Sequence, residues 1–132
     1  MLLERRDSYD SLYRDFRWQV PARFNIGVAV SDAWAGREPD RVALIAHRSD
    51  AAPATLTASL VRRGLRRGDR VAILLPQGFA VAIAHAAIYK AGAIAVPLAL
   101  LFGTEALEYR LHAAGVRVVV TNAAGLVKLK PI

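Results

Sequence analysis

The sequence predicts an α/β fold in which a mainly parallel sheet carries helices on both faces. Short apolar runs alternate with segments of helical length, and turn-forming residues separate them. The run at 70–75 is apolar after its first residue, which is typical of a strand buried on both faces of a parallel sheet. Most segments between the runs are long enough for right-handed crossovers. The expected strands are residues 42–46, 70–75, 93–98 and 117–121.

The first part of the chain is predicted to hold two helices. Residues 1–20 are polar and aromatic and indicate a short amphipathic helix that runs into Pro21. Asn25 can cap a second helix, which Gly36 ends. Apolar residues of that helix recur at helical spacing, so we expect them to form one buried face. They are Ile26, Ala29, Val30, Ala33 and Trp34.

Three more helices are expected between the later strands. They cover residues 55–67, 78–91 and 104–114. Gly64 weakens the first of them, while Gly92 and Gly115 end the other two. Thr104 is expected to cap the third. Pro97 cannot donate to a strand ladder, so it marks the end of the strand at 93–98 or an edge of the sheet.

Composition indicates one globular domain. The chain has 132 residues, of which 55% are hydrophobic and 22% charged. With no cysteine there is no disulfide, no thiolate nucleophile and no cysteine-based metal site. His47, His85 and His112 are far apart and lack carboxylates at metal-ligand spacing. No metal site is therefore expected.

The chain is basic, which raises the question of a nucleic-acid partner. Lys and Arg number 18 against 11 Asp and Glu, a formal charge of +7. The densest group, Arg62, Arg63, Arg66 and Arg67, is interpreted as the last turns of a helix, where cations complement the helix dipole. The other cations are scattered without interleaved aromatic residues. We therefore expect no nucleic-acid partner; a basic nucleic-acid binder would lose affinity steeply with salt.

Residues 71–101 are the only segment that invites comparison with a membrane span, because Lys90 is their single charge. Residues 76–78 and the pair Gly92 and Pro97 divide the segment into pieces of strand and helix length. We expect no membrane span, with a bent membrane hairpin as the minor alternative. The N-terminal residues have no secretory-signal pattern, and the location expected is cytoplasmic.

No loop at an expected strand end is equipped for catalysis. The sequence has no GxGxxG, GxxxxGK[ST] or GxSxG pattern, so we predict no catalytic, cofactor-binding or metal-binding residues. His85 is interpreted as a helical histidine with satisfied hydrogen bonds. Asp69 is interpreted as a turn residue that accepts from backbone amides, and Lys90 as a cation in the last turn of a helix.

Residues 68–122 contain three sequence motifs that resemble those of a known enzyme family. They are GDRV leading to LLPQ, YKAGA leading to VPL, and LFG with YRL. Upstream, FNI, DAWA and PDRVAL fit the same pattern, so that the similarity extends over about residues 24–130. In order and spacing these pieces resemble the N-terminal region of AMP-forming acyl-CoA synthetases of the adenylate-forming superfamily. The third piece is similar to that of acetyl- and medium-chain acyl-CoA synthetases. The resemblance implies an N-terminal extension over residues 1–23 and an incomplete N-terminal subdomain of such a synthetase over residues 24–132.

The resemblance implies ATP-dependent activation of a carboxylic acid to an acyl-adenylate, followed by transfer to coenzyme A, as in fatty acid metabolism. The family's phosphate loop, adenine motif, ribose-binding aspartate and C-terminal lysine lie beyond the part that this chain resembles, so no site residue is carried over. ATP, Mg²⁺ and coenzyme A are therefore expected for complete members and no cofactor for this chain, which we expect to be an inactive ligase fragment. Residues 46–68 are also shorter than in relatives, consistent with an internal deletion.

If the strands that follow in complete members of the family are absent, the sheet has an unpaired edge and exposes apolar surface. Self-association, or pairing with a full-length synthetase, is the expected consequence. A non-enzymatic interaction module that pairs through this edge is the alternative function.

Overall fold

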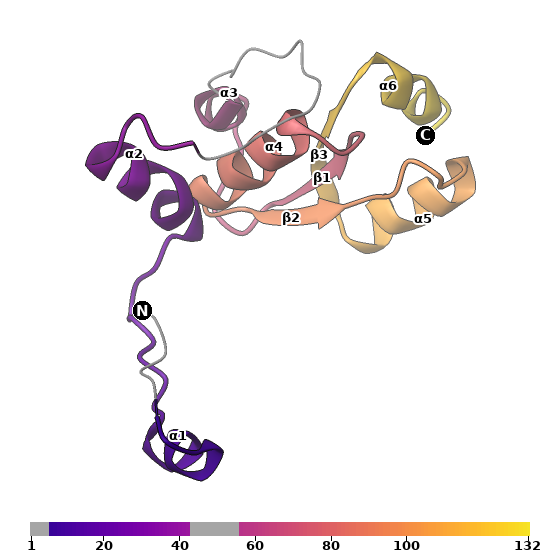
Figure 1. Ribbon diagram of the computed structural model, residues 1–132. Coiled ribbons are helices and arrows are strands. Elements are labelled where there is room, and N and C mark those ends of the chain that lie inside the picture. The colour runs from indigo at the N-terminus through magenta and orange to yellow at the C-terminus, as the bar shows by residue number, and fades with distance from the viewer. Residues whose placement is uncertain (1–5, 43–55) are drawn as a thin grey trace.

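The computed structural model describes residues 6–42 and 56–132 and contains a three-stranded sheet with helices around it (Figure 1). The strands are β1 (Arg70–Leu74), β2 (Ile94–Pro97) and β3 (Val116–Thr121). The helices are α1 (Tyr9–Asp15), the π-helical turn η1 (Val28–Asp32), α2 (Ala33–Arg37), α3 (Leu56–Arg62), α4 (Phe79–Lys90), α5 (Thr104–Ala113) and α6 (Ala123–Leu129).

All three strands are parallel, in the order β2-β1-β3, which confirms the predicted fold class. Val71 pairs with Ala95 on one side and with Val118 on the other. The central strand β1 is the apolar run expected to be buried on both faces, and Val71 to Leu74 are all buried. The fourth expected strand, 42–46, lies almost wholly outside the described residues.

The two crossovers place helices on opposite faces of the sheet. The chain runs from β1 through α4 to β2, and then back through α5 to β3 on the far side of β1. Two right-handed crossovers in opposite directions must lie on opposite faces. The first core, between α4 and the sheet, contains Leu60, Leu65, Val71, Ile73, Ala84, Ile88 and Ala93. The second, on the α5 face, contains Ala72, Leu74, Leu98, Leu107 and Leu111.

Glycines end the helices α4 and α5 as the sequence predicts. Gly92 has φ +71 and Gly115 has φ +57, the left-handed conformation that follows many helix ends. Among the described residues the short strand β2 lies at an edge of the sheet and ends at Pro97, which confirms the placement expected for a proline.

The helix after Asn25 differs from its prediction in the face that it buries. Asn25 is the cap, because the Val28 N–H donates to its Oδ1 at 3.1 Å, and helical residues continue to Arg37. However, the expected buried face is wrong: Ile26 is 48% exposed and Val30 58%. The reason is that η1 packs on α4, and the buried residue at this contact is Gly27, directly before η1.

Two further helix boundaries are corrected. The helix expected over 55–67 ends at Arg62, because the chain turns at Gly64, whose φ is +83. Arg63, Arg66 and Arg67 therefore lie in the turns before β1 rather than in the last turns of a helix. Thr104 is the first residue of α5 and not its cap; Gly103 occupies the cap position, without a side-chain bond.

No helix or strand is predicted for residues 122–132, yet α6 forms there. Asn122 starts it, because its side-chain oxygen accepts from the Gly125 N–H at 2.9 Å. At the other end, Ser8 and Ser11 form a capping box for α1, which stands apart from the sheet in Figure 1.

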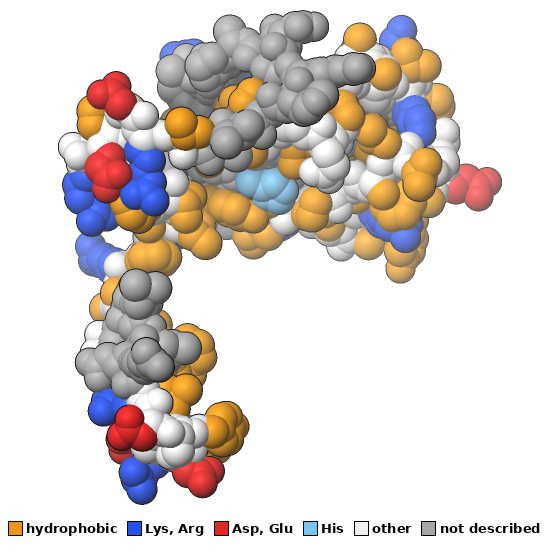
Figure 2. Space-filling view, viewed as in Figure 1, with side chains coloured by type: hydrophobic (Ala, Val, Ile, Leu, Met, Phe, Trp, Pro, Cys, Tyr) orange, Lys and Arg blue, Asp and Glu red, His pale blue; other side chains and the backbone are white. Residues whose placement is uncertain are grey.

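The described surface mixes charge and hydrophobic groups. Figure 2 shows Lys and Arg side chains at several separate places on the visible face, with hydrophobic side chains between them. None of the helices in the described ranges combines the length and hydrophobicity that a membrane crossing requires.

Candidate functional site at the strand ends

The order of the strands identifies where a ligand would bind in a fold of this kind. In open parallel sheets, ligands bind beyond the carboxyl ends of the strands, where the strand order reverses. Here β2 and β3 lie on opposite sides of β1, and the helices that follow β1 and β3 cover opposite faces. The candidate site is therefore at the carboxyl ends of the strands, where the loops after β1, β2 and β3 lie.

The ends of β1 and β3 are tied together by the chain itself. The Thr121 hydroxyl donates to the Leu74 carbonyl oxygen at 2.8 Å. Gly125 of α6 is buried against this bond, and a Cβ there would collide with Thr121 Oγ1 and approach the Leu74 carbonyl oxygen to 3.2 Å. The start of α6 thus packs directly onto these two strand ends.

Lys128 supplies positive charge near the carboxyl ends of the strands. Its Nζ is partly buried and donates to the carbonyl oxygens of Leu100 and Phe102 in the loop after β2. The ammonium group therefore ties α6 to that loop. The loop after β1, which leads to α4 on the other face of the sheet, contains exposed Gln77 and Gly78. No side chain caps the first turn of α4.

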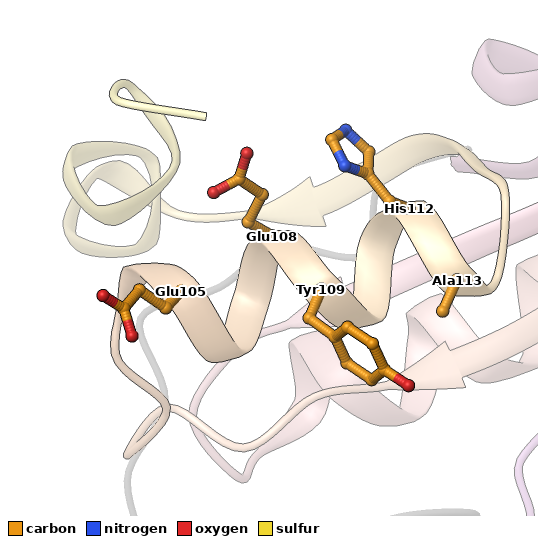
Figure 3. Close-up of a pocket in the computed structure, with 5 residues that line it drawn as sticks. All are labelled: Glu105, Glu108, Tyr109, His112 and Ala113. Atoms are coloured by element: carbon orange, nitrogen blue, oxygen red, sulfur yellow. The ribbon is translucent and has the colours of Figure 1, made fainter.

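An open hollow of about 540 Å³ lies along α5. The residues that line it are Glu105, Glu108, Tyr109, His112 and Ala113. Figure 3 shows that all of them come from one helix, with Glu108 and His112 on one side and Tyr109 on the other. Their side chains do not converge on one point, and within residues 6–42 and 56–132 no three His, Asp or Glu side chains are grouped to hold a metal ion.

Asp69 lies at the amino ends of the strands, opposite the candidate site, directly before β1. Its Oδ2 accepts from the Arg66 N–H at 2.8 Å, as expected of a turn residue, and forms an ion pair with Arg117 at 2.7 Å. The bond from the Arg66 backbone, followed by the charge of Arg117, lowers the pKa of Asp69 below its usual value.

Lys90 and His85 also lie away from the strand ends. Lys90 is the last residue of α4, and its Nζ is 2.6 Å from Asp32 Oδ2, which lowers the pKa of Asp32. The His85 Nδ1 is 3.0 Å from the Tyr89 hydroxyl oxygen on the same helix. Asp69, Lys90 and His85 are thus held by different partners, and the structure does not bring them into one site.

The sequence pattern does not single out Thr121, Gly125 or Lys128. The available signal was Asn122, a good helix cap, followed by Leu126 and Leu129 at helical spacing. That pattern predicts a helix, but it does not indicate that the helix closes over the ends of β1 and β3.

Residues 31–131 match the family of proteins described as AMP-binding enzyme. The chain belongs to this family. The matched residues contain all three strands and the elements that surround them, and they confirm the resemblance drawn from residues 68–122.

The relatives of this chain include acyl-CoA synthetases. It is 31% identical over 124 residues to the human protein named acetyl-coenzyme A synthetase 2-like, mitochondrial. It is 35% identical over 94 residues to acetyl-coenzyme A synthetase of Halorhodospira halophila. These matches cover 83% and 70% of the chain but only 18% and 15% of the relatives.

A solved structure has a similar fold over most of the chain. Acyl-CoA synthetase of Brucella canis superposes with a TM-score of 0.81 at 28% identity. The superposition covers 93% of this chain and 26% of the Brucella protein. The chain thus spans about a quarter or less of the length of these three proteins.

Proposed function

We propose that this chain is the sheet-forming N-terminal part of an AMP-forming acyl-CoA synthetase, and that residues 1–132 alone do not activate a carboxylic acid. The observation that supports the proposal is that the polar side chains at the carboxyl ends of the strands already have hydrogen-bond partners within the chain. Thr121, Asn122 and Lys128 are each hydrogen-bonded to the backbone.

Adenylation requires the opposite arrangement. Transfer of a nucleotidyl group needs donors and cations aimed at the phosphates, together with Mg²⁺, because charge develops there in the transition state. The one lysine described at the strand ends is directed at two carbonyl oxygens instead. We therefore assign ATP, Mg²⁺ and coenzyme A to complete synthetases and no cofactor to this chain.

The experiment is ATP–pyrophosphate exchange on the purified chain with acetate, butyrate and octanoate. A full-length acetyl-CoA synthetase is the positive control, and circular dichroism establishes that the chain is folded. We expect no exchange above background from the folded chain. Exchange that depends on the added acid would contradict the proposal and require a phosphate site within residues 1–132.

A second candidate is a non-enzymatic interaction module that pairs through a sheet edge. It is favoured by the unpaired outer edges of β2 and β3 within the described residues. Its test is co-purification of the tagged chain with a full-length synthetase, which the first candidate does not require. The cytoplasmic location stays a prediction, because the human relative bears a mitochondrial name.

A further inference from the structure

Residues 6–24, the N-terminal arm, contain no buried residue in the described part of the chain. The helix α1 lies within the arm, and Figure 1 shows it apart from the sheet. The arm nevertheless carries large apolar side chains that are 67% to 82% exposed. They are Tyr9, Tyr13, Trp18, Val20 and Phe24. Exposed apolar groups gathered on one segment mark a surface on which another part of a protein packs.

The helix α1 needs packing in order to be stable. It has seven residues, and an isolated helix shorter than about 12–15 residues is marginal in water, because few hydrogen bonds offset the cost of nucleation. Most helices in proteins obtain their stability from a packed apolar face. Tyr9 and Tyr13 form such a face on α1, with their rings stacked 6.1 Å apart. In the described residues no element buries this face.

The Brucella canis acyl-CoA synthetase has the same arm placement within a much longer chain. Its superposition covers 93% of this chain and leaves out only about nine of the 132 residues, so it includes most of the arm. With a TM-score of 0.81 over that span, the arm and the sheet have similar relative positions in the two proteins. About three quarters of the Brucella protein lie outside the superposition. That part can supply a surface for the arm, which the described residues of this chain do not.

The charges of the arm favour a protein surface over a polyanion. The arm has four arginines and three aspartates, so its charges nearly cancel. Nucleic acids and anionic membranes bind segments with a clear excess of Lys and Arg. Tyr and Trp are instead the residues that contribute most to protein interfaces, because they bury a large area with few rotatable bonds.

We propose that the N-terminal arm docks on the part of an AMP-forming acyl-CoA synthetase that follows the residues matched here. Tyr9, Tyr13 and Trp18 are the anchoring side chains. This inference rests on the proposed function, because the docking partner is the remainder of such a synthetase. It assigns to the arm a role in holding the N-terminal part and the remainder of the enzyme together.

The experiment compares hydrogen exchange of residues 9–24 in two proteins. The first is the chain of residues 1–132. The second is a chimera in which this chain replaces the matching part of the Brucella canis acyl-CoA synthetase. In the isolated chain we expect residues 9–24 to exchange as fast as an unstructured peptide, while residues 70–74 of the buried strand β1 are protected. In the chimera we expect slow exchange in both segments.

Matched variants test the anchoring side chains. Trp18→Ser removes an exposed aromatic anchor, and Arg23→Ser places the same small residue at an exposed charged position of the arm. We expect Trp18→Ser to lower the melting temperature of the chimera and to leave that of the isolated chain unchanged. Arg23→Ser is expected to change neither.

Slow exchange of residues 9–24 in the isolated monomeric chain overturns the proposal, because the arm would then pack on its own domain. Fast exchange of these residues in a folded chimera also overturns it, as does a Trp18→Ser chimera that is as stable as its parent.

If the chimera does not fold, exchange is measured on the intact Brucella protein. Slow exchange in its segment that superposes on residues 9–24 supports the proposal, and fast exchange there overturns it. None of these results depends on whether residues 1–132 catalyse ATP–pyrophosphate exchange, so the two proposals fail separately.

Discussion

The backbone of Gly27 crosses α4 at Lys90 so closely that a Cβ on residue 27 would lie 2.5 Å from the Lys90 backbone nitrogen. It would also lie 2.8 Å from the carbonyl oxygen of Ala86. Both neighbours are helix backbone, which cannot move aside as a flexible side chain can. This contact positions the N-terminal helical segment against the sheet domain.

Gly27→Ala is therefore expected to destabilise the chain. Overpacking at a close contact costs about 1–3 kcal/mol. The control is Gly36→Ala in α2, where a Cβ meets nothing within 4 Å. Alanine favours a helix by up to about 1 kcal/mol over glycine, so this control is expected to be neutral or stabilising. Urea unfolding of both variants measures the difference, and equal effects would contradict the close contact.

Asn25 has two roles that substitutions can separate. Its Oδ1 accepts from the Val28 N–H, and its Nδ2 donates to the Lys90 carbonyl oxygen at 3.0 Å. Asn25→Ala removes both bonds, and loss of the cap alone costs about 1 kcal/mol. Asn25→Ser keeps a capping oxygen for the Val28 N–H and loses the donor to Lys90, so we expect a smaller loss of unfolding free energy. A serine variant as unstable as the alanine variant would show that the cap contributes nothing.

The sequence predicts the central part of this fold because its signals there are local. The apolar run of β1 can be buried only inside the sheet, and Gly92 and Gly115 mark helix ends by a conformation that other residues adopt with strain. Periodicity fails for the helix after Asn25. It indicates which residues share a face, but not what lies opposite, and here the contact is made by Gly27.

The candidate site is harder to predict because its contacts join distant parts of the chain. Thr121 and Leu74 are 47 residues apart, and Lys128 reaches a carbonyl 28 residues before it. Neither contact has a local pattern, since each depends on which strands become neighbours. A polar residue at a strand end is visible in the sequence, whereas its partner follows only from the strand order β2-β1-β3.

Thr121→Val tests the bond between the ends of β3 and β1. Valine keeps the shape of threonine but removes the donor to the Leu74 carbonyl oxygen, and such a loss costs about 1 kcal/mol. Thr104→Val makes the same chemical change at an exposed position of α5, where about 0.5 kcal/mol or less is expected. Denaturant unfolding compares the two. If Thr121→Val is as stable as the wild type, the hydroxyl bond does not hold the strand ends together.

Asp69 is expected to make stability depend on pH in the acid range. The backbone bond from Arg66 and the charge of Arg117 lower its pKa in the folded state below the unfolded value of about 3.9. A lowered carboxyl pKa contributes stability that is present above the unfolded pKa and is lost as the pH falls through the folded pKa. Asp69→Asn cannot ionise, so the difference in unfolding free energy between wild type and variant should be largest near neutral pH and narrow below about pH 4. Asp40→Asn, in an exposed turn, controls for the change in net charge. A difference that stays constant from neutral to strongly acid pH would mean that Asp69 does not stabilise the fold through its charge.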